Sequence, residues 1–431
     1  MTAAVMASWQ SPSRLDPPDR AGETRPDPGT LNVLIATALE ASLLREENRP
    51  LTFRLMLRSP ERFRDAADSP TELHRLRFAK PRPFTAQQLR RLTPAVDFER
   101  SLVGISADDD GLKIWGIVQS GVRWLEQFHG GRGNALDLPD SLIIGVRDPG
   151  YMVVSQGSRP LCALEGGRLQ TSRMNVFESE WFPDTFAVVR EELRQVHAAA
   201  RAESNVPWAE LDPEFTRMVA RQMILRLIST IQRSRHGGTL LIVPCGRARE
   251  ITRENALIRL KYRFAAEEPR ARVRTLIIRA MNMLAAEEPR RMGGRTVVGW
   301  DDYGRAGGRE WTELDEAIFE MAHQIATLTA VDGAVVVTRS FELLGFGGEI
   351  SGSLAEVPFV ARALDLEGEA YALESTEEVG TRHRSVYRLC NTEQDVLGIV
   401  VSQDGGIRFV RWKDFQVMYW NHSMVTPASA R

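Results

Sequence analysis

The strongest constraint on the fold is an order of segments that occurs twice in the second half of the chain: a long amphipathic helix leads into a short, wholly apolar strand. Apolar side chains recur at helical spacing over 215–231, and TLLIVP follows at 239–244. The same pattern over 314–328 precedes DGAVVVTRS at 332–340. Strands this apolar are covered on both faces. With a later hairpin around 403–406, this order predicts an α/β layered domain with a mixed sheet.

The first half has a different pattern, in which apolar runs alternate with turns. ERSLVGISADDDGLKIWGIVQSG at 99–121 and SLIIGVRDPGYMVVSQGSRPLCAL at 141–164 both read as hairpins. Helical segments flank them, so this half is expected to form an α+β domain with a mostly antiparallel sheet. The segments predict a disordered tail at 1–29, this first domain at 30–205, the α/β domain at 213–412 with a helical insertion at 247–310, and a C-terminal tail at 413–431.

Composition excludes several classes of protein. There are 55 basic and 57 acidic residues, a formal net charge of -2, so we expect no nucleic-acid partner and no binding to a membrane surface. No apolar run approaches the ~20 residues that span a bilayer. Cys162, Cys245 and Cys390 are too far apart for a zinc site or a disulfide framework, which favours a reduced, cytoplasmic location.

Three short motifs after residue 330 can carry chemistry. The first is Asp332-Gly333-Ala334, at the junction between a helix and a strand. A carboxylate there can hold a divalent metal or polarise a hydroxyl group, and the glycine lets a ligand approach the backbone. Because Asp-Gly pairs are also ordinary turn residues, the triplet alone does not decide between these readings.

The second motif is a basic helix start, in which Thr381 is expected to cap the helix. Basic side chains at a helix N-terminus oppose the helix dipole, each by ~0.3–1 kcal/mol, unless an anion binds there. Guanidinium groups also match phosphate geometry. The expected phosphate-binding residues are Gly380, Thr381, Arg382, His383, Arg384 and Ser385. The alternative is a set of internal salt bridges to Glu374, Glu377 or Glu378.

The third motif is VSQDGGI at 401–407, a hairpin with Asp404 at its tip. A turn of this composition needs no functional explanation. Asp404 is nevertheless a candidate second metal ligand beside Asp332.

In this order the three motifs resemble the nucleotide-binding domain of diadenylate cyclases of the DisA type. That family has a DGA strand start, a GTRHR-type helix start and a VSEE-type hairpin, which appear here as VDGAVVV, VGTRHRSV and VVSQDGGI. The resemblance covers roughly 213–412. The acidic pair of the hairpin is replaced by Gln403 and Asp404, and LLGFGGEI at 343–350 replaces the usual strand after DGA. Residues 30–205 resemble the sensor-type region called DACNV, found ahead of some members of the family.

The resemblance implies that two ATP molecules are joined into cyclic di-AMP with release of pyrophosphate. Two such domains would meet face to face as a homo-oligomer, each holding one ATP. Asp332 would be the catalytic residue and a metal ligand for Mg²⁺ or Mn²⁺. Gly333 and Ala334 would allow close approach of the ATP, and the basic helix start would hold its phosphates. The N-terminal region would regulate the assembly.

Two other readings remain open. The altered hairpin is compatible with a nucleotide-binding sensor of ATP or cyclic di-AMP that does not catalyse. An interaction module, with its arginines in internal salt bridges, would bind no ATP at all. Incubation with ATP and Mn²⁺ and an ATP-induced thermal shift distinguish the three.

Overall fold

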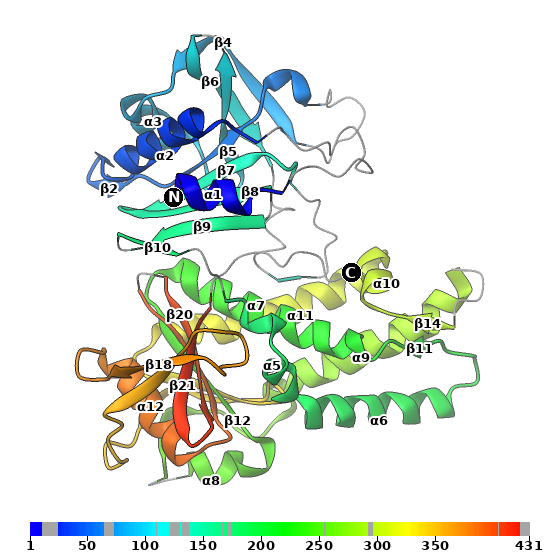
Figure 1. Cartoon of the computed structure of the whole chain (residues 1–431). Coiled ribbons are helices and arrows are strands. Elements are labelled where there is room, and N and C mark those ends of the chain that lie inside the picture. Colours follow the sequence, from blue (N-terminus) through cyan, green and yellow to red (C-terminus); the bar gives the residue numbers. More distant parts are fainter. Residues whose placement is uncertain are drawn as a thin grey trace. The chain divides into compact units, whose positions relative to one another are not determined.

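The computed structural model describes residues 1–10, 25–63, 73–108, 110–120, 130–131, 138–157, 159–165, 167–170, 174–253, 256–291, 296–403 and 405–422 (Figure 1). They fall into two compact units. The N-terminal unit contains described residues of 1–120 and 138–170, and the C-terminal unit contains 130–131 and those of 174–422. None of the described helices combines the length and the apolar character needed to cross a membrane.

The N-terminal unit is built on an eight-stranded sheet with the order β10-β9-β8-β7-β3-β5-β6-β4. The β3–β5 pair is parallel and the other described pairs are antiparallel, so a mostly antiparallel α+β domain is confirmed. The strands are β3 Phe53–Leu57, β4 His74–Pro83, β5 Ser101–Asp108, β6 Gly111–Gln119, β7 Leu142–Asp148, β8 Tyr151–Gln156, β9 Arg159–Glu165 and β10 Arg168–Gln170, with a small ribbon of β1 Arg45–Glu46 and β2 Arg49–Pro50. The helices are α1 Thr2–Ser8, α2 Pro28–Ser42 and α3 Ala86–Leu92.

The beginning of the chain differs from the disordered tail expected over 1–29. Val5 of α1 is fully buried in the same apolar cluster as Leu31 of α2 and Phe53 of β3. Asp27 caps α2 by accepting a hydrogen bond from the Thr30 N–H at 2.9 Å. The short helix α1 is therefore held by packing, which composition does not indicate. Residues 11–24 lie outside the described residues.

The C-terminal unit contains a nine-stranded sheet with the order β13-β16-β15-β12-β19-β20-β21-β17-β18. The β12–β15 and β17–β21 pairs are parallel and the rest are antiparallel, so the predicted mixed sheet is confirmed. Its strands are β12 Gly238–Val243, β13 Ile258–Arg263, β15 Ala334–Thr338, β16 Leu343–Ile350, β17 Phe359–Ala363, β18 Tyr371–Ser375, β19 Leu397–Val401, β20 Ile407–Lys413 and β21 Gln416–His422. A separate parallel pair joins β11 Glu210–Leu211 to β14 Val297–Val298.

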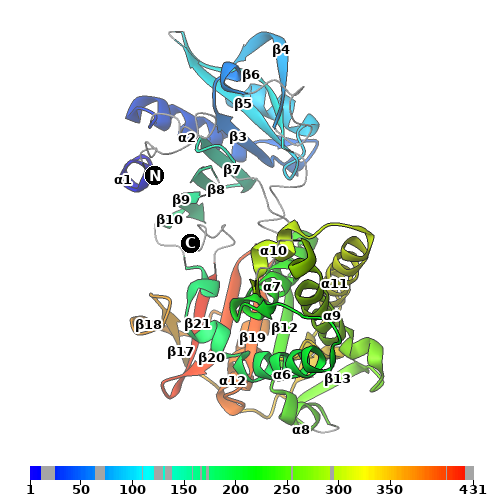
Figure 2. The same ribbon diagram turned by 90° about the vertical axis from the view of Figure 1, so that its right-hand side faces the viewer.

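Helices cover both faces of this sheet because successive residues of the central strands are apolar on both sides. Leu240 and Ile242 of β12 join the cluster that includes α7, α9 and α11, whereas Leu241 and Val243 join the cluster that includes α8 and α12. Figure 2 shows α7, α9 and α11 side by side along one side of the strands. The helices are α5 Trp181–Asp184, α6 Ala187–Glu203, α7 Glu214–Ser234, α8 Ala248–Thr252, α9 Glu268–Arg291, α10 Trp300–Arg305, α11 Arg309–Thr327 and α12 Thr381–Thr392.

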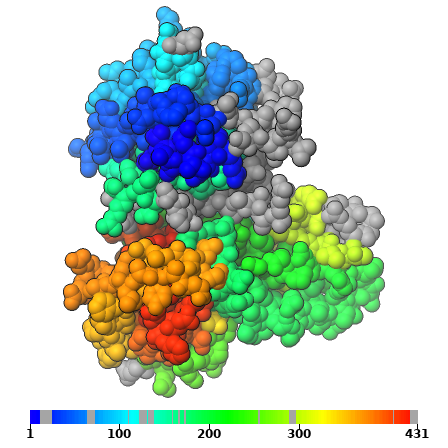
Figure 3. Space-filling view, in the orientation of Figure 1, coloured from blue at the N-terminus to red at the C-terminus, as the bar shows by residue number. Residues whose placement is uncertain are grey.

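The boundaries of the C-terminal unit differ from the predicted ones at three places. Contacts assign 174–205, including α6, to this unit rather than to the first domain. Residues 416–422, expected in a tail, form the interior strand β21. The insertion at 247–310 is not wholly helical, because β13 within it pairs with β16 and makes one edge of the sheet. At the other edge, Figure 3 shows the β17–β18 hairpin (orange) at the surface beside β20 and β21 (red).

Candidate functional site

Strand pairing brings the first and third motifs to the same edge of the sheet, namely the edge at which β12 and β15 begin and β19 ends. In the parallel pair β12–β15, Thr239 lies opposite Ala334. In the antiparallel pair β12–β19, Gly238 lies opposite Val401. The beginnings of β12 and β15 and the end of β19 are therefore neighbours, and Asp332 and Ser402 extend from the same edge.

The second motif is tied to that edge through the first turn of α12. The Arg382 guanidinium donates a hydrogen bond from Nη1 to the carbonyl oxygen of His236, at 3.2 Å. The helix begins at Thr381 with Gly380 as N-cap, and no side chain caps it, so the expected capping role of Thr381 is wrong. The N–H groups of His383 and Arg384 bind the Gly380 carbonyl at 3.0 and 3.2 Å.

Within the described residues, the glutamates proposed as alternative partners form no ion pair with the two arginines of this motif. Glu374 binds Arg362 at 2.6 Å and accepts a hydrogen bond from Tyr419. Within the described part of the chain, neither Arg384 nor Arg382 forms an ion pair with an acidic side chain. Arg384 is half-buried, and its side chain makes no hydrogen bond to a described residue, so its guanidinium remains able to bind an anion.

Gly333 has a backbone conformation that suits only glycine at this position. Its φ is +111°, and a Cβ atom there would lie 2.6 Å from the carbonyl carbon of Gly347 in β16. The glycine thus lets the backbone before β15 pack directly on β16, while Asp332 beside it stays exposed. Ala334 is buried in the sheet, so it supports the strand rather than presenting a side chain to a ligand.

A lysine that the sequence motifs did not indicate, Lys261, lies close enough to Asp332 for the charge of that carboxylate to act on it. Lys261 of β13 binds Glu349 of β16 at 2.9 Å. The hydrogen bond that Lys261 donates to Glu349 raises the pKa of Lys261, and the charge of Asp332 raises it further. The edge strand β13 therefore brings a cation to the DGA motif, through a strand pairing that local sequence does not reveal.

The hairpin between β19 and β20 is closed by backbone hydrogen bonds. The Ser402 N–H binds the Gly406 carbonyl at 2.8 Å, and Gln232 at the end of α7 donates to the Gly405 carbonyl at 2.7 Å. Gln403 is exposed. Asp404, the candidate second metal ligand, lies outside the described residues.

Two further residues, Tyr387 and Arg408, connect α12 to strand β20 of the sheet. Tyr387, one turn after His383, is fully buried, and its hydroxyl accepts a hydrogen bond from Arg408 of β20 at 3.1 Å. The Arg408 guanidinium also lies over the Tyr419 ring, 4.5 Å from its centroid. Burial raises the pKa of Tyr387. No sequence signal marked these residues, because they belong to separate elements that meet only in the fold.

The residues at this edge fit a metal held jointly with a ligand. Among the described residues, no group of three or more His, Cys, Asp or Glu side chains is placed to hold a metal ion. Asp332 supplies one exposed carboxylate. Mg²⁺ is commonly held by one or two carboxylates together with phosphate oxygens of the substrate. The site is therefore suited to a metal that arrives with a nucleotide.

Comparison with known proteins gives one family. A family model described as "Probable sensor domain DACNV" matches residues 20–119, within the N-terminal unit. The match confirms the expected DACNV resemblance for the first part of residues 30–205, up to residue 119. No curated protein and no solved structure matches the chain.

Proposed function

We propose that the C-terminal unit is a diadenylate cyclase that condenses two ATP into cyclic di-AMP, and that the N-terminal sensor domain regulates it. The observation that supports this most is the meeting of the three motifs at one sheet edge. Asp332 precedes β15, Ser402 follows β19, and Arg382 binds the His236 carbonyl just before β12. A carboxylate and a basic helix start at one edge are the parts that phosphoryl transfer needs.

The start of α12 would hold the triphosphate. The Arg384 side chain has no hydrogen-bond or ion-pair partner among the described residues, and the dipole of α12 favours an anion at this end. Arg382 fixes the helix start against His236 and adds positive charge. His383, Ser385 and the backbone of Gly380 and Thr381 complete the set of donors.

Asp332 would act on the attacking hydroxyl group. The 3′ oxygen of each ATP forms a bond to the α-phosphorus of the other, the bond from that phosphorus to the bridging oxygen breaks, and pyrophosphate leaves. The hydroxyl proton passes to Asp332 or to water. Mg²⁺ or Mn²⁺, held by Asp332 and phosphate oxygens, would neutralise charge that develops at the phosphate. Two such steps give one cyclic di-AMP and two pyrophosphates.

The reaction requires two nucleotides in opposed sites. One C-terminal unit offers one basic helix start, so the proposal needs a homo-oligomer in which two units face each other. A sensor can act on such a reaction by changing the fraction of units that are correctly paired.

The direct test is incubation of the full-length chain with ATP and Mn²⁺, followed by mass detection of the products. We expect cyclic di-AMP from the unmodified chain. Asp332→Asn should abolish it and leave ATP binding within a few-fold, whereas Glu320→Gln, which changes an exposed carboxylate of α11, should have no effect. Product from Asp332→Asn at the unmodified rate would remove the assigned role.

A second candidate is a sensor that binds ATP or cyclic di-AMP without turnover. Gln403, which replaces a carboxylate in the hairpin, and the sensor domain favour it. Saturable ATP binding without any cyclic di-AMP in the same incubation would select this function. Absence of binding to both ATP and cyclic di-AMP would reject both candidates.

A further inference from the structure

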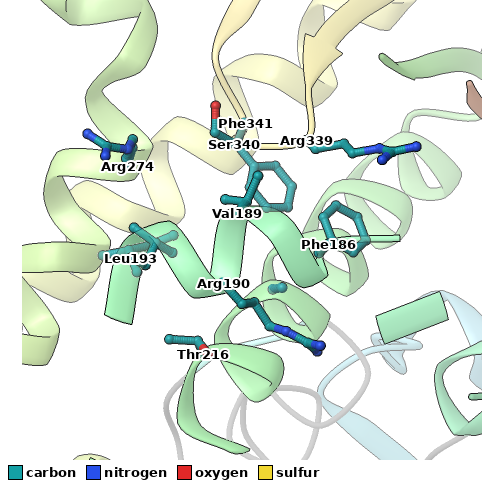
Figure 4. A pocket seen from close by; sticks show the side chains of 11 residues that line it. Phe186, Val189, Arg190, Leu193, Thr216, Arg274, Arg339, Ser340 and Phe341 are labelled. Atoms are coloured by element: carbon teal, nitrogen blue, oxygen red, sulfur yellow. The ribbon is translucent and has the colours of Figure 1, made fainter. Parts of the chain in front are cut away.

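The arginines near the end of β15 that is farther from Asp332 do not bind an anion together. Arg190 of α6, Arg274 of α9 and Arg339 of the turn after β15 line a cavity of about 20 Å³, and Figure 4 shows them on different sides of it. A space of this size holds about one water molecule, so a phosphate group cannot reach the three guanidinium groups at once. The cations near Asp332, at the beginning of the strand, are arranged differently.

Only two glycines separate Lys261 of β13 from Asp332 across the sheet. The antiparallel register of β13 and β16 places Lys261 opposite Gly347. A Cβ on Gly347 would lie 3.2 Å from the Cβ of Lys261 and 3.4 Å from its Cδ, so the lysine side chain lies over this glycine. A Cβ on Gly333, the residue after Asp332, would in turn lie 2.9 Å from the Cα of Gly347. The two glycines therefore put no side chain between the lysine and the carboxylate.

The ammonium group of Lys261 is not needed to neutralise its acidic neighbour. Glu349 of β16 binds Lys261 at 2.9 Å, but it also accepts two hydrogen bonds from the Arg259 guanidinium, one of them from Nε at 3.0 Å. Two cations thus share one carboxylate, which leaves one positive charge to act on Asp332 or on a ligand there. An ammonium group has three donors, so Lys261 can bind a further oxygen atom while it keeps its bond to Glu349.

Asp332 has cations on both sides along this edge of the sheet. In the strand order β13-β16-β15-β12-β19, Lys261 lies on one side, and Arg382 reaches the other side by binding the His236 carbonyl just before β12. Arginine binds phosphate through a planar pair of donors, whereas lysine acts as a point charge on a flexible stem. A phosphate chain at Asp332 would meet both kinds of donor.

We propose that Lys261 binds a phosphate oxygen of the ATP held at Asp332, and is thus a substrate-binding residue that lies outside the three motifs. The inference rests on the proposed function, because it requires ATP at this edge of the sheet. No bond is made or broken by Lys261. Its charge offsets the charge of the phosphate, and its side chain keeps the nucleotide close to the carboxylate.

The scarcity of lysine allows a direct test. The chain has four lysines, so acetylation by an amine-selective reagent can be followed at each one by mass spectrometry: Lys80, Lys113, Lys261 and Lys413. The nucleotide is 3′-deoxy-ATP with Mn²⁺, which lacks the attacking hydroxyl group and is therefore not consumed. At about ten times its Kd, we expect it to slow the acetylation of Lys261 about tenfold and to leave the other three lysines unchanged.

Substitution of Lys261 gives an independent measurement. Lys261→Met removes the charge, and we expect it to weaken the calorimetric binding of 3′-deoxy-ATP by about tenfold or more. Lys261→Arg keeps the charge and should stay within about threefold of the unmodified chain. Arg263→Met, which alters an exposed cation two residues further along β13, should leave the affinity unchanged. All four proteins should melt at the same temperature without nucleotide.

Equal acetylation of Lys261 with and without the nucleotide would overturn the proposal, and so would an unchanged affinity in Lys261→Met. Either result leaves the proposed function standing if the unmodified chain makes cyclic di-AMP from ATP. Conversely, binding that depends on Lys261, without any cyclic di-AMP from ATP, would support the role of the lysine and reject the cyclase. A chain that does not bind 3′-deoxy-ATP at all would reject both the cyclase and the role of Lys261.

Discussion

The Arg382 side chain spans from the first turn of α12 to the carbonyl oxygen of His236, with Nη1 and that oxygen 3.2 Å apart. This bond links the helix start to the residues before β12. Gly237, the residue after His236, has a φ of +64°, and a Cβ there would lie 2.6 Å from the Val401 carbonyl oxygen. Arg382 is therefore an anchor, while Arg384 of the same turn is available to a ligand.

The two arginines should respond differently to removal of their charge. Arg384→Met should weaken ATP binding by about tenfold to a hundredfold, because a hydrogen bond to a charged group contributes ~1.5–3 kcal/mol. Its melting temperature should stay unchanged. Arg382→Met should lower both affinity and melting temperature. Calorimetric titration and thermal melting check this, with Arg249→Met in α8 as a control. An unaltered ATP titration of Arg384→Met would exclude that side chain from the site.

Gly333→Ala should destabilise the C-terminal unit. A left-handed φ and a Cβ contact of 2.6 Å with Gly347 combine, so we expect a loss of about 2–4 kcal/mol in unfolding free energy. Gly352→Ala is a matched control, because a Cβ at that glycine would meet nothing within 4 Å. Equal urea midpoints for the two variants would mean that the close packing of Gly333 on β16 is wrong.

Local pattern was sufficient to predict the central elements. Helical spacing predicted α7, and apolar runs predicted β12, β15 and β19, because these strands are covered on both faces and their composition shows it. The GTRHR start predicted α12 to within one residue. The shared position of the first and third motifs was expected only through the family resemblance, and the pairing of β12 with β15 and β19 brings Asp332 and Ser402 to the same edge.

Elements that depend on distant partners were not predictable in this way. The strand β13 carries Arg259, Lys261 and Arg263 and becomes a strand by pairing with β16. The last strand, β21, contains polar residues and was assigned to a tail, yet it lies between β20 and β17. The positions of Lys261 near Asp332 and of Arg408 against α12 were not predictable either, because they follow from the register of strands that are distant in sequence.

Tyr387→Phe should lower stability through loss of one buried hydrogen bond. The hydroxyl accepts from Arg408 at 3.1 Å, so its removal leaves a guanidinium donor unpaired there and should cost about 1–2 kcal/mol. Tyr371→Phe in β18 removes the same atom from a side chain that is 46% exposed, and it should be neutral. Urea unfolding measures both. If the two variants unfold at the same midpoint, the bond to Arg408 does not hold α12.

His422 should make the stability of the C-terminal unit depend on pH. Burial, with a contribution from Arg221, lowers its pKa from 6.5 to about 3, and its Nδ1 accepts a hydrogen bond from the Val176 N–H at 3.2 Å. The folded state therefore keeps the imidazole neutral, while the unfolded chain protonates it below pH 6.5. The unfolded state binds more protons, so stability falls as the pH is lowered from 6.5 towards 3, by up to about 1.4 kcal/mol per pH unit.

His422→Gln isolates this contribution, because glutamine cannot take up a proton and its amide oxygen can still accept from Val176. Carboxylates contribute to acid sensitivity in both proteins, so the quantity to compare is the difference in unfolding free energy between the unmodified chain and the variant at pH 7, 6 and 5. We expect that difference to shrink as the pH falls. His323→Gln, at an exposed position of α11, should show a constant difference. A His422→Gln difference that is constant from pH 7 to 5 would mean that His422 is protonated as readily in the fold as in the unfolded chain.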